Sequence, residues 1–194
     1  MAERKDMHDH EAIARLKQGD IAGLAPLVHQ YQYQAVRAAI LVVRDRAAAE
    51  DIVQSAFLRV VQRIQQFDSQ RAFGPWFMKI VLNDALKDAQ RRERQSSLDQ
   101  SNAAGLALFE ELMSNEPQPE ALLEQDALRE SVMQALNQLT PLQRAAIVQR
   151  YYLGMSEAEM ADDAATSAGA IKQRLFGARE RLRRLLAPII NESV

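Results

Sequence analysis

The sequence predicts an all-α protein made of two small helical domains. Apolar residues recur every three or four positions from residue 11 to about 95 and again from 128 to 186, and no strand-like alternation persists. The segment between these blocks is rich in Ser, Asn, Gln, Pro and acidic residues. We therefore expect a first domain at 1–95, a flexible acidic linker at 96–127 and a second domain at 128–194.

Composition limits the classes of protein to which this chain can belong. Its 194 residues carry a formal net charge of −2, so any binding to nucleic acid must come from local basic patches rather than a global field. The chain has no cysteine, which excludes disulfides, thiolate metal sites and cysteine redox sensing. Residues 1–6 lack the apolar core of a signal peptide, and the apolar run at 38–43 is too short to span a bilayer. We expect a cytoplasmic protein with no membrane insertion.

In the first domain, Asp45 can cap a long helix that continues past residue 60. Asp51, Gln54 and Ser55 fall outside its apolar face and form a polar surface suited to a partner protein or to water. The helical periodicity by itself favours the second alternative, a surface that contacts only water. The apolar positions of this helix that share one face are Ile52, Ala56, Val60 and Ile64.

A break at residues 67–74 precedes Pro75, which we expect at the first position of the next helix. Aromatic residues at the start of this helix stand near a basic run that ends at Arg94, and such a combination can stack on unpaired bases. Aromatics at helical spacing are more often core, and we expect Phe77 and most of Trp76 to be core. The polar residues of the loop and of the outer helical face are the better candidates for contact.

In the second domain, three residues can each cap the start of a helix. Thr140 precedes Pro141 and forms a capping box with Gln143, and this helix should end near Gly154. Ser156 caps a short helix that runs to about Asp163, and Ser167 caps a third helix. One apolar stripe follows along the third helix at Ile171, Leu175, Ala178, Leu182 and Leu185.

A short capped helix, a tight turn and a basic helix form the outline of a helix-turn-helix, which points to duplex DNA. The basic helix would enter a major groove with its amino end first. A solvated basic face is the common alternative for an Arg-rich helix, but the preceding capped helix favours DNA binding. The residues nearest the bases and phosphates would be Ala168, Gly169, Lys172, Gln173 and Arg174.

Signals for other chemistry are weak. The segment 8–11, His-Asp-His-Glu, could bind a metal ion, but it has no further ligand at a defined spacing. The sequence has no Gly-rich phosphate loop, no nucleophile elbow and no His-Glu-x-x-His motif. We expect no catalytic residues, no metal and no cofactor.

Three ordered motifs carry a family resemblance. The first is Ala-Glu-Asp-x-x-Gln-x-x-Phe at 49–57, and the second is Trp-x-x-x-Ile-x-x-Asn at 76–83. The third is Gly-x-Ile-Lys-x-Arg-Leu-x-x-Ala-Arg at 169–179. Together they cover most of residues 11–186, and the chain resembles a bacterial RNA polymerase sigma factor of the small extracytoplasmic-function (ECF) type.

The resemblance implies roles that spacing alone does not give: binding to core RNA polymerase and to promoter DNA, and control by an anti-sigma factor. Core polymerase contact is implied for Asp51, Gln54 and Phe57. Contact with the single-stranded −10 element is implied for Asp68, Ser69, Arg71, Phe73, Trp76, Asn83, Lys87 and Arg91. Contact with the −35 duplex is implied for Ser167, Ala168, Gly169, Lys172, Gln173, Arg174 and Arg179.

The chain departs from the family pattern at three places, one of which is the recognition helix, where Ala168, Phe176 and Gly177 differ from the common choices. Lys87 and Gln90 stand where many members have Asp and Arg, and Asp88 and Arg91 are each displaced by one position. Ala164-Ala165 replaces the usual Leu-Gly at the helix-turn-helix turn, where alanine at a positive φ costs about 1 kcal/mol relative to glycine.

The acidic linker has two interpretations, an RNA-like strand inside the polymerase or a solvated spacer. Residues 106–113 could add a short helix that packs between the domains. Three functions therefore stay open: a sigma factor, a sigma mimic that titrates an anti-sigma factor, and an ordinary helix-turn-helix regulator. The first two motifs argue against the last of these.

Overall fold

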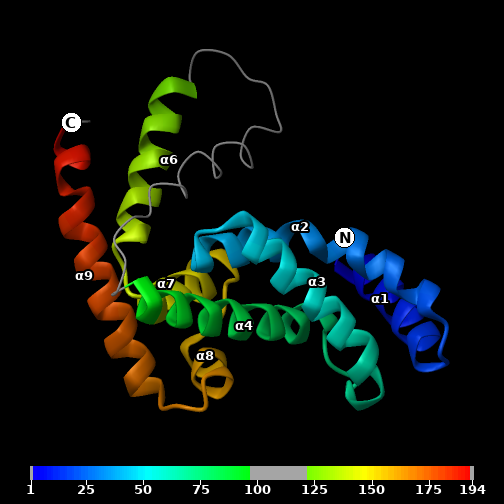
Figure 1. Cartoon of the computed structure of the whole chain (residues 1–194). Coiled ribbons are helices and arrows are strands. Elements are labelled where there is room, and N and C mark those ends of the chain that lie inside the picture. Colours follow the sequence, from blue (N-terminus) through cyan, green and yellow to red (C-terminus); the bar gives the residue numbers. More distant parts are fainter. Residues whose placement is uncertain (1, 97–121, 193–194) are drawn as a thin grey trace.

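The structure is a computed structural model that describes residues 2–96 and 122–192, and all of its regular elements in this part are helical, as predicted (Figure 1). The first half contains α1 (Ala2–Lys17), the 3₁₀ turn η1 (Ile21–Gly23), α2 (Leu24–Val43), α3 (Arg46–Arg63), η2 (Ile64–Gln66) and α4 (Phe73–Ser96). The second half contains α6 (Leu122–Asn137), α7 (Pro141–Ile147), the π-helical turn η3 (Val148–Tyr152), α8 (Glu157–Asp163) and α9 (Ala168–Glu192). The predicted short helix at 106–113 and most of the acidic linker lie outside the described residues.

The first four helices share one core, in which α2, α3 and α4 pack against one another and α1 lies at one end (Figure 1). Phe77 is fully buried at its centre, as predicted, with its ring stacked 4.3 Å from Phe57 and 5.7 Å from Phe73. The helix starts follow local chemistry. Asp45 caps α3 by accepting a hydrogen bond from Ala48 N at 2.9 Å, and this bond and the Arg92 guanidinium hold the pKa of Asp45 below its ordinary value against its partial burial.

One predicted helix start was wrong by two residues. Helix α4 begins at Phe73, so Pro75 is its third residue rather than its first. Proline is tolerated there because the N–H groups of the first turn have no acceptor within the helix. Helix α6 begins at Leu122, inside the segment expected to be linker. Its acidic composition resembles a linker, but Leu, Ala, Glu and Gln are strong helix formers.

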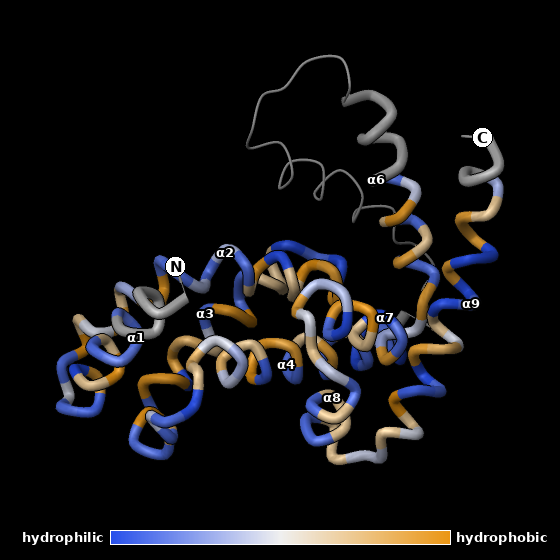
Figure 2. The backbone as a smooth tube through the Cα atoms, turned by 180° about the vertical axis from the view of Figure 1, so that it is seen from behind, coloured by the Kyte–Doolittle hydropathy of each residue, from blue (hydrophilic) through white to orange (hydrophobic). Residues whose placement is uncertain are grey.

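The second core gathers residues of α6, α7, α8 and α9 around Met160, Ile171 and Leu175, each at most 1% exposed. Figure 2 shows hydrophilic and apolar positions alternating along α9. Ile171, Leu175 and Ala178 are buried and Leu182 packs against the same core, so this part of the predicted stripe is confirmed.

The two halves pack against each other through α7, which contacts both α2 and α4. Ala145 and Val148 belong to the apolar core of the first half, although they lie in the second. Arg144, only 2% exposed, donates from Nε to Val42 O at 2.9 Å and from Nη1 to Leu139 O at 3.2 Å. It therefore binds carbonyl groups of both halves.

Two of the carbonyls that accept from Arg144 lie in the last turns of helices, where no N–H of the same helix is available to them. Val42 is in the last turn of α2, and Leu136, whose carbonyl accepts from Arg144 Nη1 at 3.5 Å, is in the last turn of α6. Arg44 follows α2 and donates to Asn137 O at 3.0 Å. Two arginines thus join the carboxyl ends of two helices, which are the negative ends of the helix dipoles.

Candidate nucleic-acid interface

Helix α3 presents the predicted polar surface to solvent. Asp51, Gln54 and Ser55 are exposed, and a shallow groove separates this face from α4, where Arg59 of α3 pairs with Asp84 of α4 at 2.6 Å. Phe57 was expected to contact the polymerase, but it is 6% exposed and stacks on Phe77. Phe57 therefore holds α3 in the core, and the polar residues form the surface.

The loop at residues 67–72, between η2 and α4, is held by the first helix. Lys17 donates from Nζ to Phe67 O at 2.8 Å and to Ser69 Oγ at 2.9 Å, and His10 Nε2 lies 3.1 Å from Ser69 O. Asp68 folds the loop on itself, since its Oδ1 accepts from Gln70 N at 3.0 Å. Asp68 and Arg71 remain exposed and Ser69 is half-buried, so the loop is preorganised with polar groups facing outward.

No sequence motif pointed to α1 as the support of this loop. Asp9, buried and considered above only as a weak metal ligand, accepts hydrogen bonds from Tyr31 Oη and from Gln30 Nε2, the latter at 3.0 Å. Tyr31 in turn packs so closely on α4 that a Cβ at Gly74 would lie 2.9 Å from its ring. A small residue at the start of α4 is thus needed next to a tyrosine held by α1.

The aromatic residues behind the loop are mainly core. Phe73, expected at the −10 element, is 2% exposed and packs on Tyr31 and Phe77, so it cannot offer a free ring to a base. Trp76 is half-buried, with its ring 4.8 Å from Phe67. Burial of Phe73 was not predicted, because a loop residue next to glycine gives no periodic signal.

The outer face of α4 carries the remaining candidates for the −10 element. Asn83 is half-buried, and Lys87 and Arg91 are exposed. The displaced acidic residue Asp88 accepts from Arg91 and from Arg92, each at 2.5 Å. Arg91 is thus held along the helix by a neighbouring carboxylate.

The helix-turn-helix forms as the sequence predicts. Thr140 and Ser156 each make a complete capping box, and Ser167 Oγ accepts from Ala170 N at 3.1 Å at the start of α9. Helix α8 ends in a Schellman turn, in which Thr166 N donates to Ala161 O at 2.9 Å and Ala165 N to Asp162 O at 3.2 Å. The expected positive φ is found at Ala165, at 46°.

The amino end of α9 is open to solvent. Ser167, Ala168, Gly169, Lys172, Gln173 and Arg179 are exposed, and Arg174 is half-buried. Lys172 is 3.9 Å from Glu157 of α8, a loose contact that leaves it able to reach a phosphate. Phe176, which was not predicted as a site residue, is 63% exposed one turn further along. Its outward position could have been inferred from the stripe, because it lies opposite Ile171, Leu175 and Ala178.

We expect Ala165→Gly to raise the free energy of unfolding by about 0.5–1 kcal/mol, because glycine adopts positive φ without the Cβ clash but loses more entropy on folding. Urea unfolding monitored by circular dichroism would measure it. Ala164→Gly is the matched control: its φ is −86°, so the same substitution one residue earlier should give no gain. A loss of stability in Ala165→Gly would show that the turn is unstrained.

An ion pair joins α4, which carries candidate −10 contacts, to α8 of the helix-turn-helix. Lys79 of α4 is 3.0 Å from Asp163 at the end of α8, and the Asp163 side chain is 4% exposed. Gln149 donates to the other oxygen of Asp163 at 3.0 Å. Lys79 and Asp163 Oδ1 form an ion pair without a hydrogen bond between them. One ion pair thus joins the end of α8 to α4, the helix that carries Trp76 and Asn83.

A helix-turn-helix, a preorganised polar loop and a basic helix in one all-α chain define a class of DNA-binding protein with two separate contact surfaces. Comparison with known protein families identifies the family to which this chain belongs. The Sigma-70 region 2 family model matches residues 27–95, and the Sigma-70 region 4 family model matches residues 129–182. The chain belongs to the sigma-70 family as a sigma factor of the ECF type, which makes it a transcription initiation factor.

Relatives match nearly the whole chain. RNA polymerase sigma factor NccH of Alcaligenes xylosoxydans is 33% identical over 177 residues, covering 91% of this chain and 94% of the relative. The ECF RNA polymerase sigma-E factor of Escherichia coli is 30% identical over 195 residues, covering 96% and 98%. The RNA polymerase sigma-H factor of Pseudomonas aeruginosa is 26% identical, covering 95% and 97%.

Solved structures share the fold. CnrH, in complex with the cytosolic domain of CnrY, superposes with a TM-score of 0.64 at 24% identity, covering 93% of this chain and 98% of that one. RpoE of Bartonella quintana, in complex with the anti-sigma factor NepR, gives 0.58 at 23% identity, covering 79% and 89%. None of the helices described here is long and apolar enough to cross a membrane.

Proposed function

We propose that this chain binds core RNA polymerase and directs promoter-specific initiation by contacting the −10 and −35 elements, without catalysing a reaction itself and within the cytoplasm. The observation that carries this proposal is the pair of solvent-facing polar surfaces, one on α3 and α4 and the other on α9, in a chain of the ECF family. The two family matches also support the division into two domains joined by a linker.

The structure narrows the residues we assign to each contact. On α3, Asp51 and Gln54 would bind the polymerase, and Phe57 would position them from the core. Phe73 would likewise support the −10 loop rather than touch DNA. The −10 contacts would be Asp68, Ser69, Arg71, Asn83, Lys87 and Arg91, with the exposed part of the half-buried Trp76. The −35 contacts would be Ser167, Ala168, Gly169, Lys172, Gln173, Arg174 and Arg179.

An anti-sigma factor is part of this proposal. CnrH and RpoE of Bartonella quintana were both solved with partner proteins, the latter with an anti-sigma factor. By analogy, a partner would bind this chain and compete with polymerase or DNA. The sigma-mimic alternative is less well supported, because a protein that only titrates an anti-sigma factor has no need to keep Lys172 and Arg179 exposed on a recognition helix.

The test is reconstitution of the purified chain with core RNA polymerase, followed by run-off transcription from a library of promoter fragments. Asp51→Ala should reduce association with core polymerase about tenfold, since an exposed charge that becomes desolvated at an interface is worth one or two kcal/mol. Circular dichroism should show unchanged helix content.

The matched control is Glu11→Ala, which removes an exposed carboxylate from α1, away from this surface. It should leave association with core polymerase unchanged. Failure of the wild-type chain to bind core polymerase would overturn the proposal. Binding without initiation at any promoter would favour the mimic.

A further inference from the structure

The junction between the two domains contains a positively charged cavity of about 310 Å³. It is lined by the end of α2, the middle of α9, the carboxyl half of α4 and the segment that joins α6 to α7. A cavity of this size is within the range of small-ligand sites, and it lies where two domains meet, a common location for them. The charged residues that line it are Arg44, Asp45, Arg92, Glu93, Arg144 and Arg181.

Among the described residues, three of the four arginines form no ion pair. Arg92 pairs with Asp45 at 2.9 Å and with Asp88 at 2.5 Å, so its charge is balanced. Within the part of the chain that the structure describes, no carboxylate pairs with Arg44, Arg144 or Arg181. Glu93 also lines the cavity and has a partner of its own.

Arg144 is the most costly of these charges, because it is 98% removed from solvent. Burial, and then the nearby charge of Arg44, lower the pKa of Arg144 to about 10. Its Nε and Nη1 donate to backbone carbonyls, whereas Nη2 has no acceptor among the described residues. Each of the two helix ends supplies roughly half a negative charge. The carboxylate of Glu93 also acts on Arg144, since it raises the pKa that burial lowers. Part of the charge of the three guanidinium groups still remains uncompensated.

We propose that this cavity binds a small phosphoryl anion, held by the guanidinium groups of Arg44, Arg144 and Arg181. Guanidinium groups bind phosphate oxygens through paired, charge-assisted N–H donors. Arg144 is buried, Arg44 is half-buried and Arg181 is exposed at the mouth of the cavity. Arg44 belongs to the first domain, whereas Arg144 and Arg181 belong to the second. The bound anion therefore holds the two domains in their packed arrangement.

The test uses the full-length chain with pyrophosphate and inorganic phosphate as separate probes at constant ionic strength. Line broadening in ³¹P NMR measures binding of the probe. The rise in the melting temperature measures how much the bound probe stabilises the folded chain. Wild type should bind either or both probes. Arg44→Gln and Arg181→Gln should each weaken binding about tenfold, the size expected for one lost charge-assisted contact. These variants avoid the buried Arg144, whose loss can unfold the protein.

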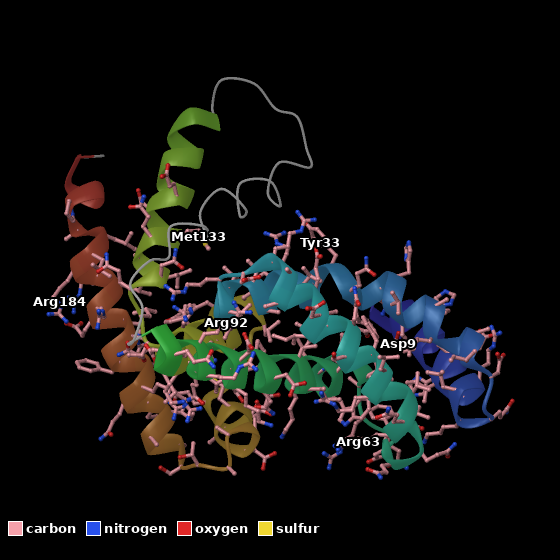
Figure 3. All side chains as sticks on the ribbon, in the orientation of Figure 1. Asp9, Tyr33, Arg63, Arg92, Met133 and Arg184 are labelled. Atoms are coloured by element: carbon pink, nitrogen blue, oxygen red, sulfur yellow. The ribbon has the colours of Figure 1, made fainter. Side chains whose placement is uncertain are left out.

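Arg184→Gln is the matched control, since Arg184 is an exposed arginine of the same helix and points away from the first domain (Figure 3). It should bind like wild type. Absence of broadening with both probes, or equal weakening in Arg184→Gln, would overturn the site. Binding of a citrate control as tightly as pyrophosphate would overturn the phosphoryl assignment.

Small-angle X-ray scattering with and without the bound probe tests the link to domain packing. With the probe bound, the radius of gyration should be no larger than without it. Added urea should increase the radius of gyration less when the probe is bound than when it is absent. Binding that leaves the urea-induced expansion unchanged would overturn this link. None of these measurements uses polymerase or DNA, so their failure is separate from failure of the proposed function.

Discussion

Replacing Arg144 with alanine is expected to lower the free energy of unfolding by about 3–5 kcal/mol. The guanidinium donates to Val42 O, Leu136 O and Leu139 O, and Leu136 O also accepts from Leu139 N at 3.1 Å. Val42 O and Leu139 O therefore lose a donor, and each buried carbonyl left without a donor costs about 1–3 kcal/mol. The substitution also leaves a cavity where α7 packs on α2. Urea unfolding followed by circular dichroism measures the loss, and crosslinking measures whether the domains separate.

Two further variants identify the cause of that loss. Arg144→Met keeps most of the volume but removes the donors, so it should remain destabilised by most of the same amount. Arg184→Ala removes an exposed arginine from α9 and should change stability little. If Arg144→Met is as stable as wild type, the Arg144 side chain acts by filling space, and the carbonyls that lose its donors bind water instead.

Promoter binding by the holoenzyme is expected to weaken about a hundredfold when Lys172 and Arg174 are both replaced by alanine. Each side chain can supply one charge-assisted hydrogen bond to a phosphate or a base, and each such bond is worth roughly tenfold in affinity. The plot of log K against log salt should also flatten by about one unit per lost phosphate contact. Fluorescence anisotropy on a promoter fragment selected with wild-type holoenzyme measures both.

The control for this experiment is Arg183→Ala, which removes an exposed cation that pairs with Glu180 about four turns beyond the amino end of α9. It should leave affinity for the −35 half of the site nearly unchanged. An unchanged salt slope in the double variant would mean that Lys172 and Arg174 face solvent in the complex. Weakening of core polymerase binding instead would place these residues on a protein interface.

Features that depend on near neighbours in the chain were predicted well. Thr140, Ser156 and Asp45 cap helices as expected, because a side-chain oxygen reaches an N–H two or three residues ahead whatever the rest of the fold does. The positive φ at Ala165 was also expected, since a Schellman turn has the same local geometry in any protein. The all-α class and the helix-turn-helix followed from these signals and from the apolar stripe of α9.

The sequence by itself thus determined the helices, their caps and the exposed basic end of α9, all of which depend on residues within a few positions of one another. Only the tertiary structure decided that Phe57 and Phe73 are buried, that Lys17 holds the loop at Ser69, and that Arg144 joins two helix ends. The loop contact spans 52 residues and the Arg144 contact spans 102. No periodicity encodes such pairs, because their free energy depends on burial and on donors and acceptors that meet only when the domains pack.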